Sequence, residues 1–362
     1  MTDHTQYMHQ AIKLAEQARF ISPPNPWVGC VIVKDNQIVG QGYTQPPGQA
    51  HAEICALQQA KEKAKNATLY ATLEPCAHTG RTPPCTDAII KAGIREVYYG
   101  VEDPDCRVKG KGAMTLQQAG IQVFQGIGKE IIEKSLAPYF FQRQTGLPYT
   151  ILKSAISLDG RTAAEDGTSQ WLTCSLARQD VHLQRSHSQA ILIGAGTALK
   201  DQPRLTVRDA QNFPIVAPLR VLLDAKGQVP AQGPLFDCQL ALTLVVTTEH
   251  SSIQKRMEWQ MAGAEVAIVS PSSTGVDLHE TWKLLGQRSI LQVFVEGGSK
   301  LQTALIEASL FNRLLIYIAP LLLGSSGRPF YQKEMKTLQE AYRLSLQETL
   351  QIGECVRLDY VR

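Results

Sequence analysis

The segment Thr68-Leu69-Tyr70-Ala71-Thr72-Leu73-Glu74-Pro75-Cys76 decides the fold of the first part of this chain. It starts with a short, largely apolar run that is typical of a buried strand, and Glu74-Pro75-Cys76 ends that strand. Pro84 and Cys85 open a predicted helix over 84–92, which Gly93 ends. A strand followed by a helix is the repeating unit of α/β proteins, so the segment predicts this fold class.

The same alternation extends in both directions through the first ~145 residues. Asp3 and Gln6 form a predicted capping pair at the start of the first helix. The pattern then predicts two strands joined by a tight turn at Asp35-Asn36, a helix from His51 to about Lys65, and further strands and helices. The predicted strands are 28–33, 38–43, 68–73, 96–101 and 121–125, and the later helices are 84–92, 113–119 and 129–143. One hairpin followed by alternating elements predicts a helix–sheet–helix sandwich.

A second alternating series begins after Thr145-Gly146-Leu147-Pro148, where glycine and proline interrupt the periodic pattern. We therefore predict two domains, 1–146 and 147–362. In the second domain we predict a helix over 175–188 and extended edge strands over 347–360. Strands are predicted at 150–156, 190–193, 220–223, 242–247, 266–269, 291–296 and 314–318.

Composition excludes several classes of protein. With 362 residues, 44% hydrophobic and 19% charged, the chain is globular and long enough for about two domains. A net charge of +3 does not suggest a nucleic-acid partner. The longest apolar run, 314–323, is too short to span a membrane, and the N-terminus lacks the pattern of a secretory signal. Eight cysteines without an export signal suggest thiols or metal ligands, so we predict a cytoplasmic protein.

The first domain contains a predicted metal site. His51, Cys76 and Cys85 supply one imidazole and two thiolates, which leaves the fourth position of a tetrahedral zinc ion for water. Glu53 follows His51 by two residues, close enough to carry protons from that water to a departing amine. An H-x-E motif followed by P-C-x-x-C is typical of zinc deaminases, although the two cysteines here are farther apart.

Two glycine-containing turns in the second domain could cradle a phosphate. Glu296-Gly297-Gly298-Ser299 and Gly194-Ala195-Gly196-Thr197 each follow a predicted strand and precede a helix. Either could instead be a tight turn that binds nothing. The chain lacks the G-x-G-x-x-G fingerprint, which argues against the usual dinucleotide-binding domain.

Three stretches resemble the bifunctional deaminase–reductases of riboflavin biosynthesis: Cys76-Ala77-His78-Thr79-Gly80-Arg81-Thr82-Pro83-Pro84-Cys85, Asn25-Pro26-Trp27-Val28-Gly29 and Lys153-Ser154-Ala155-Ile156-Ser157-Leu158-Asp159-Gly160-Arg161. The resemblance covers essentially the whole chain. It implies a cytidine-deaminase-like three-layer αβα sandwich followed by a dihydrofolate-reductase-like α/β domain. It also implies a zinc-dependent deamination of a diaminopyrimidinone ribosylamino phosphate, and then an NADPH-dependent reduction of the ribosyl group to ribityl. We expect a homo-oligomer.

The resemblance also assigns residues. Asn25 and His78 are expected to contact the pyrimidine. The expected NADPH contacts are Ala155, Trp171, Thr197, Asp201, Gly298, Ser299, Lys300, Leu301, Gln302, Thr303 and Ala304. The expected substrate contacts in the second domain are Ser169, Arg185, Leu205, Arg208 and Glu296, and guanidinium groups suit a ribose phosphate. Arg185 could instead be a solvated charge on a surface helix.

Some positions are assigned more loosely or depart from the family. Lys153 with Glu296 is the candidate for stabilising charge during reduction. Asp103 and Lys109 lie in a loop that resembles the family's substrate-side loop, but Asp105-Cys106 stands where relatives commonly have Asn-Pro. Ala225 stands where relatives often place a serine beside the cofactor. The other cysteines are predicted to be ordinary thiols: Cys30, Cys55, Cys106, Cys174, Cys238 and Cys355.

Three alternatives remain at this point. The chain could be a deaminase with a degenerate second domain. It could be a nucleic-acid deaminase that acts on a flipped base, although residues 1–146 carry 15 basic and 13 acidic side chains and are not a basic module. A purely structural zinc module would need a fourth protein ligand and would have no use for Glu53.

Overall fold

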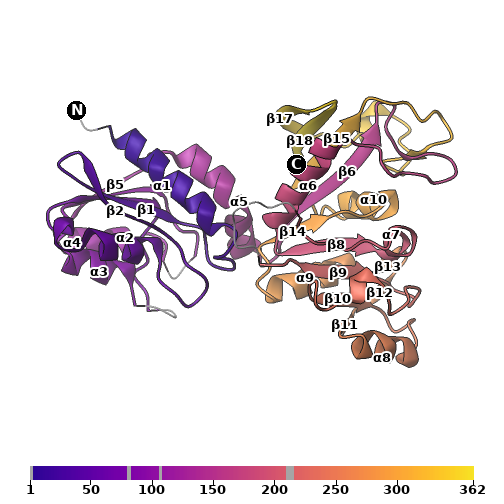
Figure 1. The fold of residues 1–362 in the computed structure, drawn as a ribbon, viewed down its shortest axis with the longest axis horizontal. Helices are drawn as coiled ribbons and strands as arrows, with labels where there is room; N and C mark the ends of the chain where they lie inside the picture. Colours follow the sequence, from indigo (N-terminus) through magenta and orange to yellow (C-terminus); the bar gives the residue numbers. More distant parts are fainter. Residues whose placement is uncertain (1–2, 80–82, 106–107, 209–215) are drawn as a thin grey trace. The chain divides into compact units, whose positions relative to one another are not determined.

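A computed structural model describes residues 3–79, 83–105, 108–208 and 216–362. The chain divides into two compact units, Met1–Gly146 and Leu147–Arg362 (Figure 1). Among the described residues, no helix combines the length and the apolar character that crossing a bilayer requires.

The first unit is built on a five-stranded sheet with the order β2-β1-β3-β4-β5. β1 runs antiparallel to β2 and β3, whereas β3, β4 and β5 are parallel. The carboxyl ends of β3 and β4 therefore lie at the same edge, just before Glu74 and Glu102. The strands are β1 (Gly29–Lys34), β2 (Gln37–Tyr43), β3 (Thr68–Leu73), β4 (Glu96–Val101) and β5 (Gln122–Gln125).

Helices cover both faces of this sheet, which confirms the predicted three-layer αβα sandwich. α1 and α5 lie on one face, and α2, α3 and α4 lie on the other (Figure 1). The helices are α1 (His4–Ala18), α2 (Ala52–Ala60), α3 (Cys85–Lys91), α4 (Lys111–Gln118) and α5 (Lys129–Thr145). The predicted cap of α1 is present, because the Asp3 side chain accepts hydrogen bonds from the backbone N–H groups of Thr5 and Gln6.

Two glycines let the helices approach the sheet closely. A Cβ on Gly29 would lie 1.9 Å from the carbonyl oxygen of Ala11 in α1. A Cβ on Gly42 would lie 2.6 Å from the carbonyl oxygen of Ala52 in α2, on the opposite face. Backbone thus packs directly on backbone where α2 begins. α2 is shorter than the helix predicted to reach Lys65, because Lys61 has a φ of 51° and the chain continues as a 3-10 helix over Lys61–Ala64.

The second unit is built on a nine-stranded sheet with the order β11-β10-β9-β8-β14-β6-β15-β18-β17. The strands from β11 to β15 are parallel, and β18 and β17 continue the sheet antiparallel to β15 and to each other. They are β6 (Tyr149–Ser157), β8 (Ala190–Gly194), β9 (Leu219–Leu223), β10 (Thr243–Thr247), β11 (Glu265–Ile268), β14 (Gln292–Val295), β15 (Arg313–Ala319), β17 (Ser345–Ile352) and β18 (Cys355–Val361). Four shorter strands pair outside this sheet: β7 (Arg161–Ala163) with β16 (Arg328–Pro329), and β12 (Pro271–Ser272) with β13 (Gly275–Val276).

The prediction of edge strands over 347–360 is half right. β17 is the edge strand and all but its last residue are exposed. β18 is an inner strand, because it pairs with β15 on one side and β17 on the other. Its buried positions alternate along the strand, as expected for a strand with one covered face.

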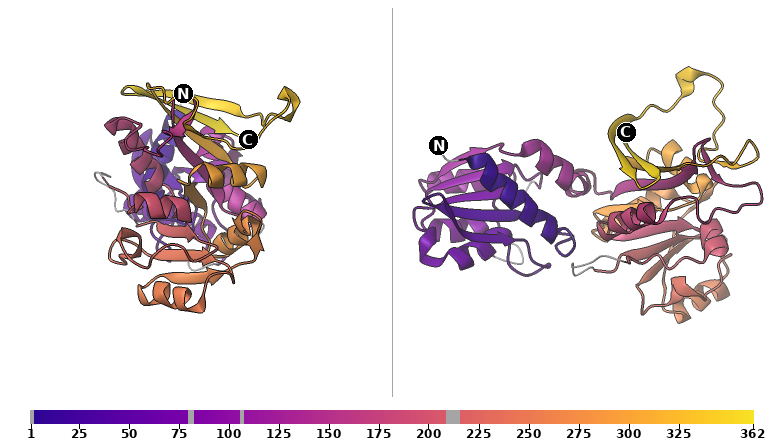
Figure 2. Two further views of the ribbon diagram at one scale, coloured as in Figure 1. Left: turned by 90° about the vertical axis from the view of Figure 1, so that its right-hand side faces the viewer. Right: turned by 45° about the horizontal axis from the view of Figure 1, so that its top comes forward.

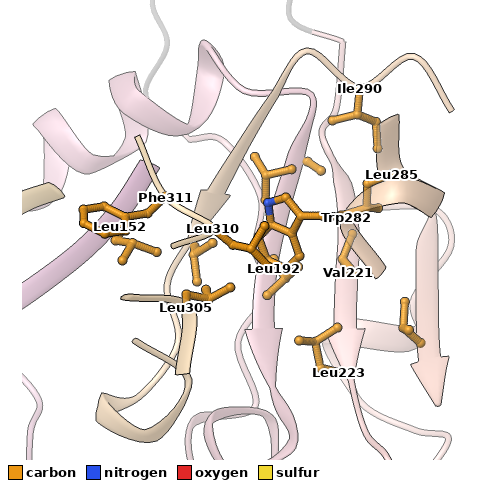
Figure 3. Close-up of a cluster of buried hydrophobic side chains, with 14 of the residues drawn as sticks. Leu152, Leu192, Val221, Leu223, Trp282, Leu285, Ile290, Leu305, Leu310 and Phe311 are labelled. Carbon is orange, nitrogen blue, oxygen red and sulfur yellow. The ribbon is translucent and has the colours of Figure 1, made fainter. Parts of the chain in front are cut away.

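Helices pack on both faces of the second sheet, and side chains from neighbouring strand positions point to opposite cores. One core surrounds Trp282 of α9 and includes Leu192 and Val221; α10 adds Leu305 (Figure 3). Two further cores lie on the opposite face. One contains Ile191 and Leu222 and is covered by α7 and α8, and the other contains Ile151 and Phe294 and is covered by α6. The helices are α6 (Ser175–Ser186), α7 (Ala195–Asp201), α8 (Ile253–Met261), α9 (Leu278–Gln287) and α10 (Ser299–Glu307). The predicted elements do not include α8 or α9. Figure 2 shows the elements from two further directions.

Candidate active sites

The structure brings together the three predicted metal ligands of the first unit. His51 is the N-cap residue of α2, Cys76 follows β3, and Cys85 is the first residue of α3. Nδ1 of His51 lies 3.6 Å from the Cys76 sulfur and 3.3 Å from the Cys85 sulfur. The three ligand atoms all lie within 4.8 Å of one another.

These distances fit a zinc ion. Tetrahedral zinc with Zn–S of about 2.3 Å and Zn–N of about 2.0 Å places a nitrogen about 3.5 Å from a sulfur. The observed nitrogen–sulfur distances of 3.6 and 3.3 Å agree with this. One nitrogen and two sulfurs are also a donor set that zinc prefers. Within the described part of the chain, no fourth His, Cys, Asp or Glu joins the group, so one coordination position is left for a small ligand.

The electrostatics of the site favour a thiolate at Cys76. The backbone N–H of Cys85 donates to the Cys76 sulfur at 3.4 Å. A hydrogen bond from the Cys85 thiol, assisted by His51, lowers the pKa of Cys76 to about 4. Because metal binds the thiolate form, Cys76 is prepared for coordination at neutral pH.

Glu53 lies beside the ligands in the first turn of α2, with only 4% of its surface exposed. Burial raises the pKa of this carboxyl group. A raised pKa brings the protonated and ionised forms of this carboxyl group closer in free energy, which suits a proton carrier.

The structure gives different support to the two predicted pyrimidine contacts. Nδ1 of His78 is buried and has no hydrogen-bond partner among the described residues, so it could be satisfied by a polar ligand. Asn25 is half-buried in a turn closed by its backbone N–H donating to the Ser22 carbonyl oxygen at 2.9 Å. Residues 80–82, in the loop after His78, are outside the described part of the chain.

Asp103 follows β4 at the same edge of the sheet and is 5% exposed. Its Oδ1 accepts hydrogen bonds from the Tyr139 hydroxyl at 3.1 Å and from the Asp105 backbone N–H at 2.9 Å. Burial nevertheless raises the pKa of Asp103 to about 6. Cys106, predicted to be an ordinary thiol, is outside the described residues.

We expect Asp103→Asn to stabilise the first unit at pH 8 but not at pH 3. The folded pKa of about 6 lies above the unfolded value of ~3.9, so this residue's stabilisation is complete below pH ~3.9 and is lost as the pH rises from there through 6. Asparagine keeps the acceptor oxygen and removes the buried charge, which should increase the free energy of unfolding by about 1–3 kcal/mol at pH 8. Calorimetric melting at both pH values tests this. An equal effect at pH 3 and pH 8 would contradict the role of the buried charge.

Glu74 is not among the residues predicted from the sequence, and the structure shows why it matters. It is buried, and its two carboxylate oxygens accept hydrogen bonds from the backbone N–H groups of Gly110 at 3.0 Å and Ala113 at 3.1 Å. Glu74 therefore ties the start of α4 to the turn that carries Cys76. A glutamate that precedes a proline gives no periodic signal, so these contacts cannot be read from the pattern.

In the second unit, the two glycine-containing turns lie next to each other. β8 and β14 are neighbouring parallel strands, so their carboxyl ends lead into α7 and α10 at the same sheet edge. The backbone N–H of Gly298 donates to the Thr197 hydroxyl at 3.2 Å, which joins the turns. A Cβ on Gly196 would meet no atom within 4 Å. This open glycine backbone at the start of α7, joined to the start of α10, fits the phosphate groups of a dinucleotide.

Residues 298–304 form the start of α10, so their side chains point in different directions. The hydroxyls of Ser299 and Thr303 accept hydrogen bonds from Gln332, through its side-chain amide and its backbone N–H. The Gln302 side-chain amide donates to the Lys153 carbonyl oxygen at 2.7 Å. These three side chains therefore connect α10 to the rest of the unit.

Arg185 and Glu296 form a bidentate ion pair, and each side chain is only 12% exposed. The interpretation of Arg185 as a solvated surface charge is therefore wrong, because α6 turns this residue toward the end of β14. Arg185 stabilises the carboxylate and holds the pKa of Glu296 below its usual range despite burial. Lys153 is close enough to add to this effect, and burial lowers its own pKa. These three residues form a buried charged cluster.

The remaining predicted contacts differ in exposure. Leu205 is buried, Ser169 is half-buried, and Arg208 is exposed. The ring of Trp171 is 68% exposed and lies 4.8 Å from the Arg178 guanidinium. The other predicted contacts lie on β6 (Ala155) and at the end of α7 (Asp201), both half-buried. Ala225 follows β9 and receives a hydrogen bond at its carbonyl oxygen from Thr248.

Comparison with known proteins places both units in described families. Residues 1–101 match the cytidine and deoxycytidylate deaminase zinc-binding region, and residues 148–358 match the RibD C-terminal domain. The chain is 42% identical to the riboflavin biosynthesis protein RibD of Chlamydia pneumoniae, over 97% of this chain and 94% of that protein. It is also 42% identical to RibD of Escherichia coli, over 98% of each chain.

Two solved structures are similar over the full length. Acinetobacter baumannii RibD superposes with a TM-score of 0.90 at 37% identity, and covers 99% of this chain and 98% of that chain. A Thermotoga maritima protein superposes with a TM-score of 0.86 at 30% identity and the same coverage. That protein is described as a diaminohydroxyphosphoribosylaminopyrimidine deaminase/5-amino-6-(5-phosphoribosylamino)uracil reductase.

Proposed function

This chain belongs to the RibD family, the bifunctional deaminase–reductases of riboflavin biosynthesis, and from that membership we propose which of its residues carry each reaction. It is an enzyme with a zinc-binding deaminase domain and a reductase domain, as predicted. We propose that the first unit deaminates 2,5-diamino-6-ribosylamino-pyrimidinone 5'-phosphate and that the second reduces the ribosyl side chain to ribityl. The product would be 5-amino-6-ribitylamino-uracil 5'-phosphate.

For deamination, His51, Cys76 and Cys85 would hold the zinc ion. Zinc bound there supplies a water nucleophile that is activated near neutral pH. Glu53 takes one proton from the attacking water and delivers it to the ring nitrogen, and it then carries the second proton of the same oxygen to the amine, which leaves as ammonia. His78 and Asn25 hold the polar edge of the pyrimidine. The observation that carries this assignment is the nitrogen–sulfur spacing of the His51 and cysteine ligands beside buried Glu53.

For reduction, the residues that would bind NADPH surround the two adjacent turns, including Thr197 and 298–304. NADPH supplies the hydride for the first carbon of the opened ribosyl group. The ammonium form of Lys153 stabilises the charge that develops on the adjacent heteroatom and gives it a proton, since burial lowers the pKa of this group and makes it a better acid. Glu296 orients both Lys153 and Arg185. The substrate phosphate is bound by Arg208.

An assay of the purified protein tests the two activities together. With the diaminopyrimidine substrate we expect ammonia release and NADPH oxidation, and metal analysis should find one zinc per chain. NADPH oxidation without ammonia release on any substrate form would remove the deaminase assignment. Ammonia release without NADPH oxidation would favour a deaminase with an inactive second unit.

Loss of the metal site should leave cofactor binding intact. Cys76→Ser replaces a thiolate ligand by a hydroxyl, so we expect loss of zinc and of deamination. The NADPH-binding residues lie in the other unit, and the dissociation constant for NADPH should stay within about twofold of wild type. Fluorescence titration of the folded variant measures it. Failure of folded Cys76→Ser to bind NADPH would contradict the separation of the sites.

We also propose where the protein is located and how it assembles. The described cysteines are free thiols, and thiol-rich enzymes that use NADPH are suited to the cytoplasm. We also propose a homo-oligomer, because β17 is an exposed edge strand whose surface includes Leu346 and Leu350. The molar mass in solution tests this.

A further inference from the structure

The segment 204–208 carries two of the proposed substrate contacts, Leu205 and Arg208, and buried side chains hold its backbone from two elements. From α6, Nη1 of Arg185 donates to the carbonyl oxygen of Thr206 at 3.0 Å. From β9, Nη1 of the fully buried Arg220 lies 3.4 Å from the carbonyl oxygen of Arg204. Leu205 is buried with a φ of 50°, a conformation that needs such support.

His182 provides the third support, at the position of Arg208 itself. It lies on α6 three residues before Arg185, so the two side chains share one helix face. His182 is 9% exposed. Nδ1 lies 3.2 Å from the backbone N–H of Arg208, and Nε2 lies 3.4 Å from Nη2 of the same residue.

Hydrogen-bond chemistry decides which of these two contacts dominates. The backbone N–H and the guanidinium of Arg208 are both donors, and a neutral imidazole can accept at only one nitrogen. The acceptor is therefore Nδ1, which makes the shorter contact, to the backbone N–H of Arg208. The ring then lies against the guanidinium and restricts where this long side chain can go.

We propose that His182 is a positioning residue that holds Arg208 for the substrate phosphate, which rests on the proposed function of Arg208. Among the ion pairs of the described residues, none involves Arg208, whereas Arg185 is engaged by Glu296. An exposed guanidinium without a carboxylate partner there is suited to an external anion. Arginine loses much rotamer freedom on binding, so a contact that orders its backbone and side chain beforehand improves affinity.

The test compares two substrates in the reductase reaction of the full chain: the phosphorylated ribosylamino compound and the same compound without its phosphate. For His182→Ala we expect the KM of the phosphorylated substrate to rise about tenfold, as for the loss of a hydrogen bond near a charged group. The KM of the dephosphorylated compound, the KM of NADPH and kcat should each change less than about twofold. Equal increases for both substrates would overturn the proposal.

Two conservative variants sharpen this test and remain informative if His182→Ala does not fold. Asparagine places an acceptor close to the position of Nδ1, so His182→Asn should keep the KM of the phosphorylated substrate within about twofold of wild type. Glutamine places its amide nearer the position of Nε2, so His182→Gln should show the higher KM. The proposal fails if asparagine is no better than glutamine.

Arg208→Ala separates this inference from the assignment on which it rests. If Arg208 binds the phosphate, Arg208→Ala weakens binding of the phosphorylated substrate much more than that of the dephosphorylated one. If it does so while His182→Ala does not, the role of His182 is wrong and the function of Arg208 stands. If Arg208→Ala affects both substrates equally, the phosphate assignment itself is wrong, and the inference falls with it.

Discussion

Glu53→Gln should lower the rate of deamination by about 10²–10⁴ while the protein keeps its zinc, because a positioned proton carrier contributes this much. Glutamine has nearly the same shape as glutamate and leaves His51, Cys76 and Cys85 unchanged. What it cannot do is accept a proton from the attacking water and pass it to the amine. The measurements are kcat for ammonia release and the zinc content of the same preparation.

Controls for this variant are available within the chain. Glu62→Gln changes an exposed glutamate in the 3-10 helix after α2, and it should deaminate at the wild-type rate. The reductase activity of Glu53→Gln should also be unchanged, because Glu53 belongs to the other unit. If zinc-loaded Glu53→Gln deaminated normally, the proton-carrying role would belong to another group.

Glu296→Ala should destabilise the second unit by about 3–5 kcal/mol, because removal of one partner leaves a buried charge unpaired. Here that charge is the Arg185 guanidinium, whose side chain is 12% exposed. Lys153 also loses its neighbouring carboxylate. The measurement must follow the second unit by itself, since a chain with two units need not unfold in one step. Hydrogen exchange of peptides from α6 and β14 does this.

An exposed ion pair in the same unit is the matched control. Arg288 and Glu265 also form a bidentate pair, but their side chains are 30% and 56% exposed. Glu265→Ala should therefore cost at most about 1 kcal/mol. The double variant Arg185→Leu with Glu296→Leu should regain part of the lost stability, since no unpaired charge remains. If Glu296→Ala cost no more than Glu265→Ala, the pair would be effectively solvated.

The sequence was sufficient to predict the features that depend on local pattern. Strand β3 matches its predicted bounds, and the Asp3 cap is where the capping pair places it. The grouping of His51, Cys76 and Cys85 could be predicted because each lies beside a strand or helix end, and such ends share a sheet edge in α/β folds. The spacing of these three residues and their imidazole and thiol groups then limited the predicted chemistry to that of a metal site.

Features that depend on contacts between distant segments could not be predicted in this way. The sequence pattern leaves Arg185 compatible with a surface position, whereas α6 turns it toward Glu296, 111 residues later. The contact of His182 with Arg208 joins a helix to an irregular segment that has no periodicity. The break in α2 arises at Lys61, a residue type that normally favours helix but that here has a positive φ.

The central place of β14 in the second sheet also has a consequence for how the chain folds during synthesis. β14 lies between β8 and β6, although it is made about 100 residues after β8. The ribosome must therefore release residue 295 before the two halves of this sheet can join, and nascent β6 and β8 wait with unpaired edges. The first unit needs nothing beyond residue 146, so we expect it to fold while the second is still being translated.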